Sequence, residues 1–224
     1  MLSFTHSEIS RAIHPSLQGH STLLEIDTAD FAALLNRAFS HKHFTADWFS
    51  TKALPLYSHL RGENISRILE IGVFEGRSAL FFAELFPDAH LTLVDVFAGP
   101  HELNFDFNLQ DQAERIKKIK KTSHAALSLD LYDERFDFIY IDGDHGAGGV
   151  LIDAILSWRL LEPGGIILFD DYDWVREELH HATRRGINTF LDLIAGSFEV
   201  LFADRQVLLR KTGKLHLLQT GAPQ

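Results

Sequence analysis

The chain contains no cysteine, which excludes disulfide bonds and thiolate metal sites. This composition fits a reducing compartment, and we expect a cytoplasmic protein. The sequence also lacks an apolar run of membrane-spanning length, and no charged-then-apolar secretory leader stands at its start. We therefore expect no association with a membrane.

Positive charge is also scarce. The 21 lysines and arginines face 31 aspartates and glutamates, giving a formal net charge of −10 at pH 7. Nucleic acid is therefore not expected as the main partner, because an acidic chain repels a phosphate backbone. The sequence has one basic run, which we interpret as a solvated helix end before a strand: Arg115, Lys117, Lys118, Lys120 and Lys121.

Hydrophobic residues make up 46% of the 224 residues, enough to fill the core of one domain. We expect residues 1–60 to form an N-terminal arm and helices packed on the core of a main domain, residues 61–224. Residues 1–26 show no strong periodicity. A helix is predicted after a cap at Asp27 or Thr28, because apolar residues recur at helical spacing at Phe31, Leu34, Leu35, Ala38 and Phe39. That stripe would pack on the sheet, on a partner subunit or in a substrate pocket.

The stretch from Arg67 to Asp95 organises the rest of the sequence. An apolar strand at residues 68–71 is followed by a turn that contains Gly72 and Gly76, by a helix with an apolar face, and by a second strand that ends on Asp95. This order predicts the first unit of a nucleotide-binding α/β sheet.

Details of the turn indicate which nucleotide it suits. A dinucleotide site needs a second glycine two residues after the first, where this chain has Phe74. Glu70 and Glu75 flank the turn, and anionic side chains there disfavour a pyrophosphate but suit a ligand with an ammonium and a sulfonium. Asp95 is placed to accept hydrogen bonds from ribose hydroxyls.

Residues 70–78, Glu-Ile-Gly-Val-Phe-Glu-Gly-Arg-Ser, resemble motif I of class I S-adenosylmethionine-dependent methyltransferases. The likeness is strongest to the methyltransferase-24 family, which includes sugar O-methyltransferases, and an Asp-Trp-Phe-Ser segment at residues 47–50 extends it. It covers roughly residues 47–211. The resemblance implies a Rossmann-like, doubly wound α/β fold with seven mostly parallel strands in the order 3-2-1-4-5-7-6 and helices on both faces.

The same resemblance implies S-adenosylmethionine as the cofactor. It assigns cofactor-binding residues at Glu70, Gly72, Phe74, Glu75, Gly76, Ser78, Asp95, Ser123 and Asp142. Ser123 would lie near the adenine, although the glycine usual just before it is absent here.

The remaining elements are predicted from periodicity. After Asp95 we expect a loop through residue 108, which serves as a lid, a substrate contact or an ordinary surface excursion, then a helix over residues 109–118 and a weak strand over 119–122. A later helix is expected over 175–194. Further strands are predicted over 136–141, 166–169, 199–202 and 206–209, the last two as an antiparallel hairpin.

Acidic residues follow two of these strands. Asp142 and Asp144 follow the strand over 136–141, and Asp170 and Asp171 follow the strand over 166–169. Because ligands bind outside the carboxyl ends of the strands in such sheets, Asp142, Asp170 and Asp171 should converge and hold Mg²⁺ or a similar divalent ion. Alternatively these acids cap the following turns, Asp142 orients the cofactor's amino group, and Asp171 contacts only the substrate.

His145 is the candidate general base, since a histidine titrates near neutrality; its alternative role is a helix-start residue bonded to backbone. Tyr172 and Trp174 would wall the acceptor pocket or simply pack. Arg184 and Arg185 would bind an anionic acceptor or lie on a solvated helix face. His180 and His181 make a poor metal pair, because adjacent helical residues point in different directions.

We therefore predict a divalent-metal-dependent, S-adenosylmethionine-dependent O-methyltransferase acting on a small-molecule hydroxyl of sugar or vicinal-diol type. One alternative is a catalytically inactive, cofactor-binding scaffold subunit, and another, less favoured, is a nicotinamide-dependent oxidoreductase. The sequence identifies neither the acceptor nor the oligomeric state, so a homo-oligomer stays open.

Overall fold

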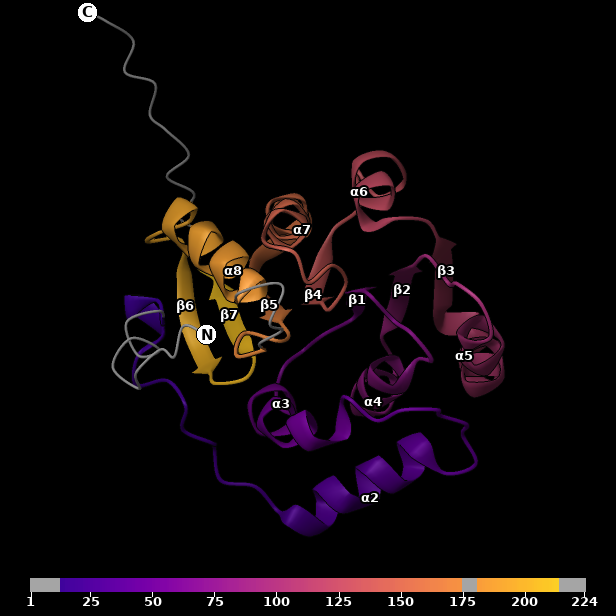
Figure 1. Ribbon diagram of the computed structural model, residues 1–224. Helices are drawn as coiled ribbons and strands as arrows, with labels where there is room; N and C mark the ends of the chain where they lie inside the picture. Colours follow the sequence, from indigo (N-terminus) through magenta and orange to yellow (C-terminus); the bar gives the residue numbers. More distant parts are fainter. Residues whose placement is uncertain (1–12, 175–180, 214–224) are drawn as a thin grey trace, which may run out of the picture.

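The computed structural model describes residues 13–174 and 181–213. Its centre is one seven-stranded sheet with the order β3-β2-β1-β4-β5-β7-β6, which confirms the predicted fold and strand order (Figure 1). The first five strands in that order run parallel, and β7 is antiparallel to both β5 and β6. The strands are β1 Arg67–Ile71, β2 His90–Asp95, β3 Ile116–Lys120, β4 Phe136–Ile141, β5 Leu161–Phe169, β6 Phe198–Ala203 and β7 Val207–Lys211.

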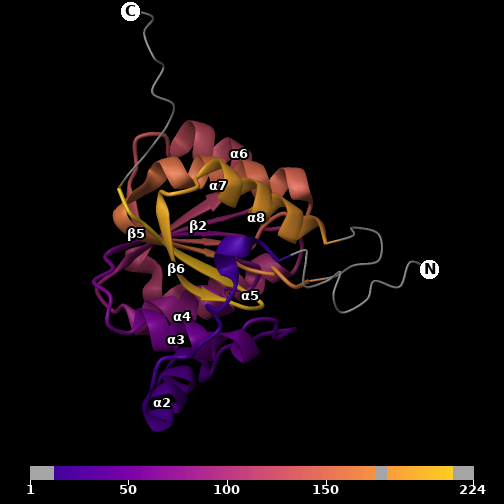
Figure 2. The same cartoon turned by 90° about the vertical axis from the view of Figure 1, so that its left-hand side faces the viewer.

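Helices cover both faces of the sheet, as Figures 1 and 2 show. One face carries α3 (Ala53–Leu60), α4 (Arg77–Leu85) and α5 (His101–Leu109), and the other carries α6 (Ser123–Ala125), α7 (Ala147–Leu160) and α8 (Ala182–Leu193). Successive side chains of a strand point to opposite faces, so Ile68 of β1 joins the first core and Leu69 the second. Strands buried on both faces explain the nearly continuous apolar runs in the sequence.

The N-terminal helix packs within its own chain. Helix α2 (Thr28–Phe39) begins after Asp27, whose side chain accepts a hydrogen bond from the Ala29 amide, as predicted for a cap. Its apolar stripe lies against α4, with Leu34 and Ala38 buried. Before it, the short helix η1 (Pro15–Leu17) packs beside β6. The described part of the arm is thus docked on the domain.

The segment between β2 and β3 differs from the prediction. Residues 101–109 form helix α5 where a loop was expected, residues 110–115 form the 3₁₀ helix η3, and β3 begins at Ile116 rather than Ile119. The predicted helix over 109–118 is wrong because β3 is an edge strand with a single buried residue, Ile119, so its pattern carries almost no strand signal.

Most of the basic run lies on this edge strand, since Lys117, Lys118 and Lys120 belong to β3, whereas Arg115 ends η3. Its lysines pair with nearby acids: Lys118 with Asp106 at 2.7 Å, and Lys120 with Glu102 at 2.5 Å. Lysines on an edge strand also prevent pairing with another strand. Carboxylates of α5 therefore pair with Lys118 and Lys120, while Lys117 pairs with Glu134 and Lys121 with Asp130.

The C-terminal region follows the prediction closely. The hairpin of β6 and β7 is antiparallel, and α8 occupies the described part of the predicted helix, of which residues 175–180, including His180, lie outside the described residues. Strand β5 is longer than predicted, since it begins at Leu161 and absorbs the Pro-Gly-Gly segment with a shift in register.

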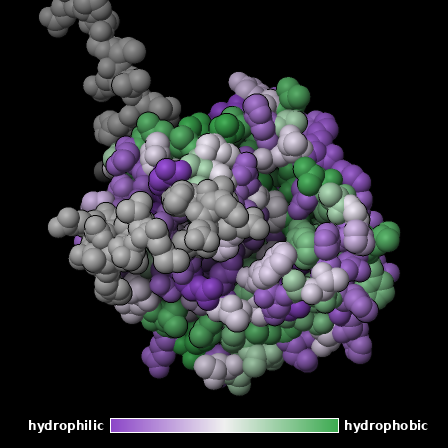
Figure 3. Space-filling model, in the orientation of Figure 1, coloured by the Kyte–Doolittle hydropathy of each residue, from purple (hydrophilic) through white to green (hydrophobic). Residues whose placement is uncertain are grey.

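Figure 3 shows one face of the molecule, coloured by hydropathy. Hydrophilic and hydrophobic residues are interspersed over the face in Figure 3. Within residues 13–174 and 181–213, no helix has both the length and the apolar character needed to cross a membrane.

Candidate active site

The turn after β1 is built around a glycine that no other residue can replace without strain. Gly72 has φ +82°, and a Cβ placed on it would lie 2.0 Å from the carbonyl oxygen of Asp142 at the end of β4. Its amide donates to the Val94 carbonyl at 2.9 Å. The absence of a side chain therefore lets the ends of β1 and β4 meet at the strand tips.

Asp95 organises this turn from the end of β2. One carboxylate oxygen accepts hydrogen bonds from the Val73 amide at 2.7 Å and the Phe74 amide at 2.9 Å. The other accepts from the Phe97 amide at 2.8 Å. The sequence predicted contacts from Asp95 to ribose, and the structure adds that this carboxylate fixes the backbone of the loop beside the cleft.

Glu70 lies beneath the turn in the core. Its side chain is fully buried and accepts a hydrogen bond from the Ser78 hydroxyl, while its second oxygen has no hydrogen-bond partner among the described residues. Burial raises the pKa of Glu70 to about 8, with the nearby Asp95 adding to the shift. Glu70 therefore holds a proton at neutral pH and does not line the cleft described below.

This proton makes stability depend on pH. The folded chain keeps Glu70 protonated up to about pH 8, whereas the unfolded chain loses the proton near 4.5, so the folded state binds more protons between these values. Stability should therefore fall as pH rises through this window. We expect the wild type to lose up to about 4 kcal/mol relative to Glu70→Gln between pH 5 and pH 8, measured by urea denaturation. Glu114→Gln, at an exposed glutamate of η3, should track the wild type, and parallel curves for wild type and Glu70→Gln would contradict the assignment.

Glu75 ties the upstream segment to the turn. Its buried carboxylate accepts from the Thr45 amide at 2.7 Å, the Thr45 hydroxyl at 2.8 Å and the Asn104 side chain at 2.8 Å, and it lies 3.2 Å from His101 Nδ1. Burial alone would raise the pKa of Glu75, but these donors lower it. Thr45 and α5 are therefore held beside the nucleotide turn through one carboxylate.

Aromatic side chains extend from this point over the turn. Phe74, which adopts a left-handed backbone with φ 51°, packs in a tilted arrangement against His101, at 4.2 Å, and Trp48, at 5.0 Å between ring centroids. Trp48 is 68% exposed. The Phe74 ring thus stands where a dinucleotide site would need a bare backbone, as the sequence predicted.

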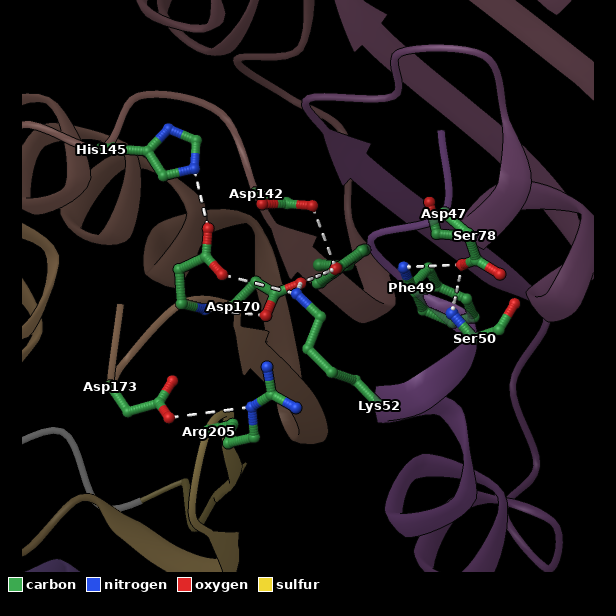
Figure 4. Close-up of polar contacts among 12 residues, drawn as sticks. Asp47, Phe49, Ser50, Lys52, Ser78, Asp142, His145, Asp170, Asp173 and Arg205 are labelled. Atoms are coloured by element: carbon green, nitrogen blue, oxygen red, sulfur yellow. Dashed lines mark hydrogen bonds and ion pairs between the residues drawn. The ribbon is translucent and has the colours of Figure 1, made fainter. Parts of the chain in front are cut away.

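The predicted acids do converge at the tips of β4 and β5, but a lysine joins them. Lys52, which ends the short helix η2 (Ser50–Lys52), places its Nζ 2.5 Å from Asp170 Oδ2 and 3.4 Å from Asp171 Oδ1 (Figure 4). Lys52 and Asp170 are 8% and 3% exposed. The Tyr140 hydroxyl donates to Asp170 and lies 3.2 Å from Asp142 Oδ2.

Burial and mutual repulsion shift the titration of this cluster. The pKa of Asp142 is raised well above its ordinary value by burial and by the charge of Asp170. Burial likewise raises the pKa of Asp170, against the opposing effect of Lys52. For Asp171 burial is outweighed by the hydrogen bond from His145 and the charge of Lys52, so its pKa is lowered. Asp171 is therefore the one of these three carboxylates whose pKa lies below its ordinary value.

His145 faces this carboxylate. Its Nε2 lies 2.8 Å from Asp171 Oδ2, and its ring stacks on Trp174 at 4.8 Å. The hydrogen bond with Asp171, followed by the charges of nearby acids, raises the pKa of His145 above its ordinary value despite burial. An imidazole oriented by a carboxylate is an arrangement suited to general-base chemistry.

A divalent ion would meet a different donor set from the predicted one. Among the described residues, ligating atoms of Asp142, His145 and Asp171 lie within 4.8 Å of one another. Asp170 is occupied, since Oδ2 contacts Lys52 and Tyr140 and Oδ1 accepts from the Asp171 amide at 2.7 Å. The predicted role of Asp170 as a metal ligand stays a prediction, and the structure gives it other partners.

These groups open onto one cleft of about 1010 Å³. A volume of this order suits a small-molecule site. Glu70 and Gly76 do not line the cleft, and Asp170 lies behind it in a small adjoining cavity with Asp142, His145 and Asp171. The predicted residues that do line it are Gly72, Phe74, Glu75, Ser78, Asp95, Ser123, Asp142, His145 and Asp171.

Other residues named from the sequence have structural partners. Tyr172 is buried, and its hydroxyl binds the His14 amide and Asn188. Arg184 is buried against the Tyr172 ring, whereas Arg185 is exposed. Asp144 accepts a hydrogen bond from the amide of Gly146, the residue before α7, and Trp174 does line the cleft.

Sequence reasoning missed two members of the acid cluster. Tyr140 carries a usable signal, because it precedes Asp142 by two residues and so points to the same face of the strand. Lys52 carries none beyond its place after the Asp-Trp-Phe-Ser segment, since its contacts come from residues more than a hundred positions away.

Residues 69–172 match a family model of the methyltransferase-24 family, described as a methyltransferase domain. A caffeoyl-CoA O-methyltransferase from Populus kitakamiensis is 31% identical over 116 residues, which cover 50% of this chain and 48% of that protein. The chain spans about half the length of the curated relatives it matches.

Solved structures share the fold. An O-methyltransferase from Bacillus cereus in complex with SAH superimposes with a TM-score of 0.60 at 19% identity, over 85% of this chain and 93% of that one. The MycE methyltransferase from the mycinamycin biosynthetic pathway, in complex with Mg, SAH and mycinamycin VI, gives 0.57 at 18% identity, over 85% and 57%. Residues 69–172 are therefore similar to a methyltransferase domain, and the chain shares its fold with solved methyltransferases.

Proposed function

We propose that the protein is an S-adenosylmethionine-dependent O-methyltransferase that acts on a small-molecule hydroxyl of sugar or vicinal-diol type. The observation that carries this proposal is the single cleft that joins the glycine turn and Asp95 to the pair of His145 and Asp171. The end formed by the glycine turn and Asp95 suits a nucleoside, and at the other end His145 can accept a proton. The relatives named as O-methyltransferases support the same reaction.

The cofactor would lie along the turn after β1. In this proposal Asp95 receives the ribose hydroxyls while it keeps the Val73 and Phe74 amides in place, and Ser123 at the start of α6 lies near the adenine. Asp153, whose buried side chain hydrogen-bonds with Ser123, holds that residue. The Trp48 and Phe74 rings cover the turn from the solvent side.

Methyl transfer would then proceed in one displacement. The acceptor oxygen attacks the methyl carbon as the bond from sulfur to that carbon breaks, and the hydroxyl proton passes to His145. The products are a methyl ether and S-adenosylhomocysteine. Asp171 orients the imidazole and stabilises its protonated form, so most of the catalytic effect comes from positioning and electrostatics.

A divalent ion, Mg²⁺ in particular, is the finer part of the proposal. Asp142 and Asp171 would supply hard carboxylate oxygens, with the His145 imidazole within reach of the same point, and this donor set fits such an ion. When bound, the ion would lower the pKa of the acceptor hydroxyl and hold its oxygens. The solved MycE complex with Mg supports this part of the proposal by analogy of fold.

Calorimetric titration tests the cofactor directly. We expect S-adenosylmethionine and S-adenosylhomocysteine to bind with a Kd in roughly the 1 µM to 1 mM range, and NAD⁺ not to bind. Trp48→Ala should weaken S-adenosylhomocysteine about fivefold to tenfold, because a ring contact is lost. Leu129→Ala removes an equally exposed apolar side chain outside the cleft and should leave the affinity unchanged.

Turnover separates the enzyme from a scaffold. Transfer of a labelled methyl group to catechols and to sugar vicinal diols is expected for at least one acceptor class. Cofactor binding with no transfer to any of these would favour the inactive scaffold, and binding of NAD⁺ in place of S-adenosylhomocysteine would overturn the cofactor assignment.

A further inference from the structure

The acid cluster already contains a cation supplied by the chain itself. Three carboxylates, Asp142, Asp170 and Asp171, meet at the tips of β4 and β5, and the ammonium of Lys52 is placed among them. Carboxylates that converge in a buried site repel one another unless a cation or protons balance them. In this chain an ammonium meets that need at Asp170.

Lys52 is held there by the packing of its own segment. Phe49, three residues earlier, is buried and packs against Phe81 and Phe82 of α4 and against the ring of Tyr140. Tyr140 in turn donates its hydroxyl to the same Asp170 that Lys52 contacts. The backbone at residue 52 is therefore fixed relative to β4 and β5, and the ammonium is not a mobile surface charge.

Both oxygens of the Asp170 carboxylate already have hydrogen-bond partners within the chain. Oδ2 receives Lys52 at 2.5 Å and also the Tyr140 hydroxyl, and Oδ1 receives the Asp171 amide at 2.7 Å. Lys52 also lies 3.4 Å from Oδ1 of Asp171, the carboxylate that faces the cleft. A divalent ion bound by Asp171 would therefore meet a positive charge at close range and one carboxylate fewer.

We propose that Lys52 is the resident cation of this acid cluster. By pairing with Asp170 it keeps that carboxylate from binding a metal, and it thereby lowers the affinity of the site for a divalent ion. The inference rests on the proposed function, because it concerns the cation requirement of the same site. It assigns the cluster a built-in charge balance that works without added metal. Lys52 acts here as a positioning residue, since it contacts the carboxylates rather than the reacting atoms.

The direct test is the affinity for metal ions alone. Mg²⁺ and Mn²⁺ are titrated calorimetrically into wild type, Lys52→Met and Lys52→Arg. Methionine keeps much of the apolar stem and removes the charge, while arginine keeps the charge. We expect Lys52→Met to bind both ions at least tenfold more tightly than wild type, and Lys52→Arg to stay within about threefold of wild type.

A second variant, Asp170→Asn, tests the same inference in a chain that keeps Lys52. If Lys52 occupies Asp170, then Asp170→Asn in the presence of Lys52 should change Mn²⁺ affinity by less than about threefold. In the Lys52→Met background the same substitution should remove most of the gained affinity, because Asp170 has become a ligand. This difference between backgrounds is the signature of a lysine that competes with metal.

Two results would overturn the proposal. One is equal Mn²⁺ affinity for wild type and Lys52→Met, and the other is loss of Mn²⁺ binding in Asp170→Asn alone. S-adenosylhomocysteine binding is measured on the same samples. If S-adenosylhomocysteine did not bind, the proposed cofactor would be wrong, but the metal affinities of wild type and variants would still test the role of Lys52. The two failures are therefore distinguishable.

Discussion

Replacing Gly72 by alanine should both destabilise the domain and abolish cofactor binding. The new Cβ would lie 2.0 Å from the Asp142 carbonyl oxygen and 2.8 Å from the Gly143 Cα, and backbone atoms cannot move aside as a flexible side chain can. Adding the strain of an L residue at φ +82°, we expect a loss of about 3 kcal/mol in the free energy of unfolding. That corresponds to a fall of about 10 °C in melting temperature.

Binding should suffer more than stability. Relief of the clash must separate the tip of β1 from the tip of β4, which moves the turn bound by Asp95 and also displaces Asp142. We expect S-adenosylhomocysteine affinity to fall at least a hundredfold, measured by calorimetry at a temperature where the variant is still folded by circular dichroism.

Gly196 offers a matched control for this substitution. It has nearly the same backbone, φ +81°, but a Cβ placed on it meets nothing within 4 Å. Gly196→Ala should therefore cost about 1 kcal/mol from backbone strain alone, with unchanged cofactor affinity. If the two variants lost equal stability and both bound S-adenosylhomocysteine normally, close approach of β1 to β4 would not be what requires Gly72.

The fold was readable from the sequence because its central signals are local. The turn between β1 and β2, the strand before Asp142 and the hairpin of β6 and β7 all have their pattern within a few residues, and all are observed. The strand order came from the family resemblance, and the structure confirms it. The weakest region was β3, where an edge strand with exposed lysines has one buried residue and so resembles a solvated helix.

The site was only partly readable, for a physical reason. Strand tips predict which acids converge, and Asp142, Asp170 and Asp171 do lie together. Which of these carboxylates is available to bind a ligand depends on the side chains that other segments of the chain place against them. Lys52 comes from a segment 118 positions before Asp170, and no spacing among residues 170–172 encodes that contact. Glu70 was predicted at the cofactor, yet its burial is a property of the packed core.

Replacing His145 by glutamine should nearly abolish methyl transfer while leaving the cofactor bound. The imidazole is the group in the cleft that a carboxylate orients for proton acceptance, and general-base contributions are typically about a hundredfold to ten-thousandfold in rate. Its ring is partly exposed, so the fold should tolerate the change. We expect kcat to fall at least a hundredfold, with S-adenosylhomocysteine affinity within about threefold of wild type, measured with the acceptor found in the methyl-transfer screen. His59→Gln, at a distant histidine that contacts the Thr22 carbonyl, should change neither value.

The dependence of kcat on pH then tests whether Asp171 sets the basicity of His145. The base must be neutral to accept a proton, so activity should rise with pH through the pKa of His145, which the hydrogen bond with Asp171 raises. Asp171→Asn removes that charge, and the activity limb should therefore move to lower pH while the maximal rate falls through loss of orientation. Measured in chelator-treated buffer, an unmoved limb in Asp171→Asn would show that a group other than His145 accepts the proton. If the rate depended instead on an acceptor bound to metal, the activity limb should shift when Mg²⁺ is added. In the absence of Mg²⁺, altering Asp171 alone should then leave the limb fixed.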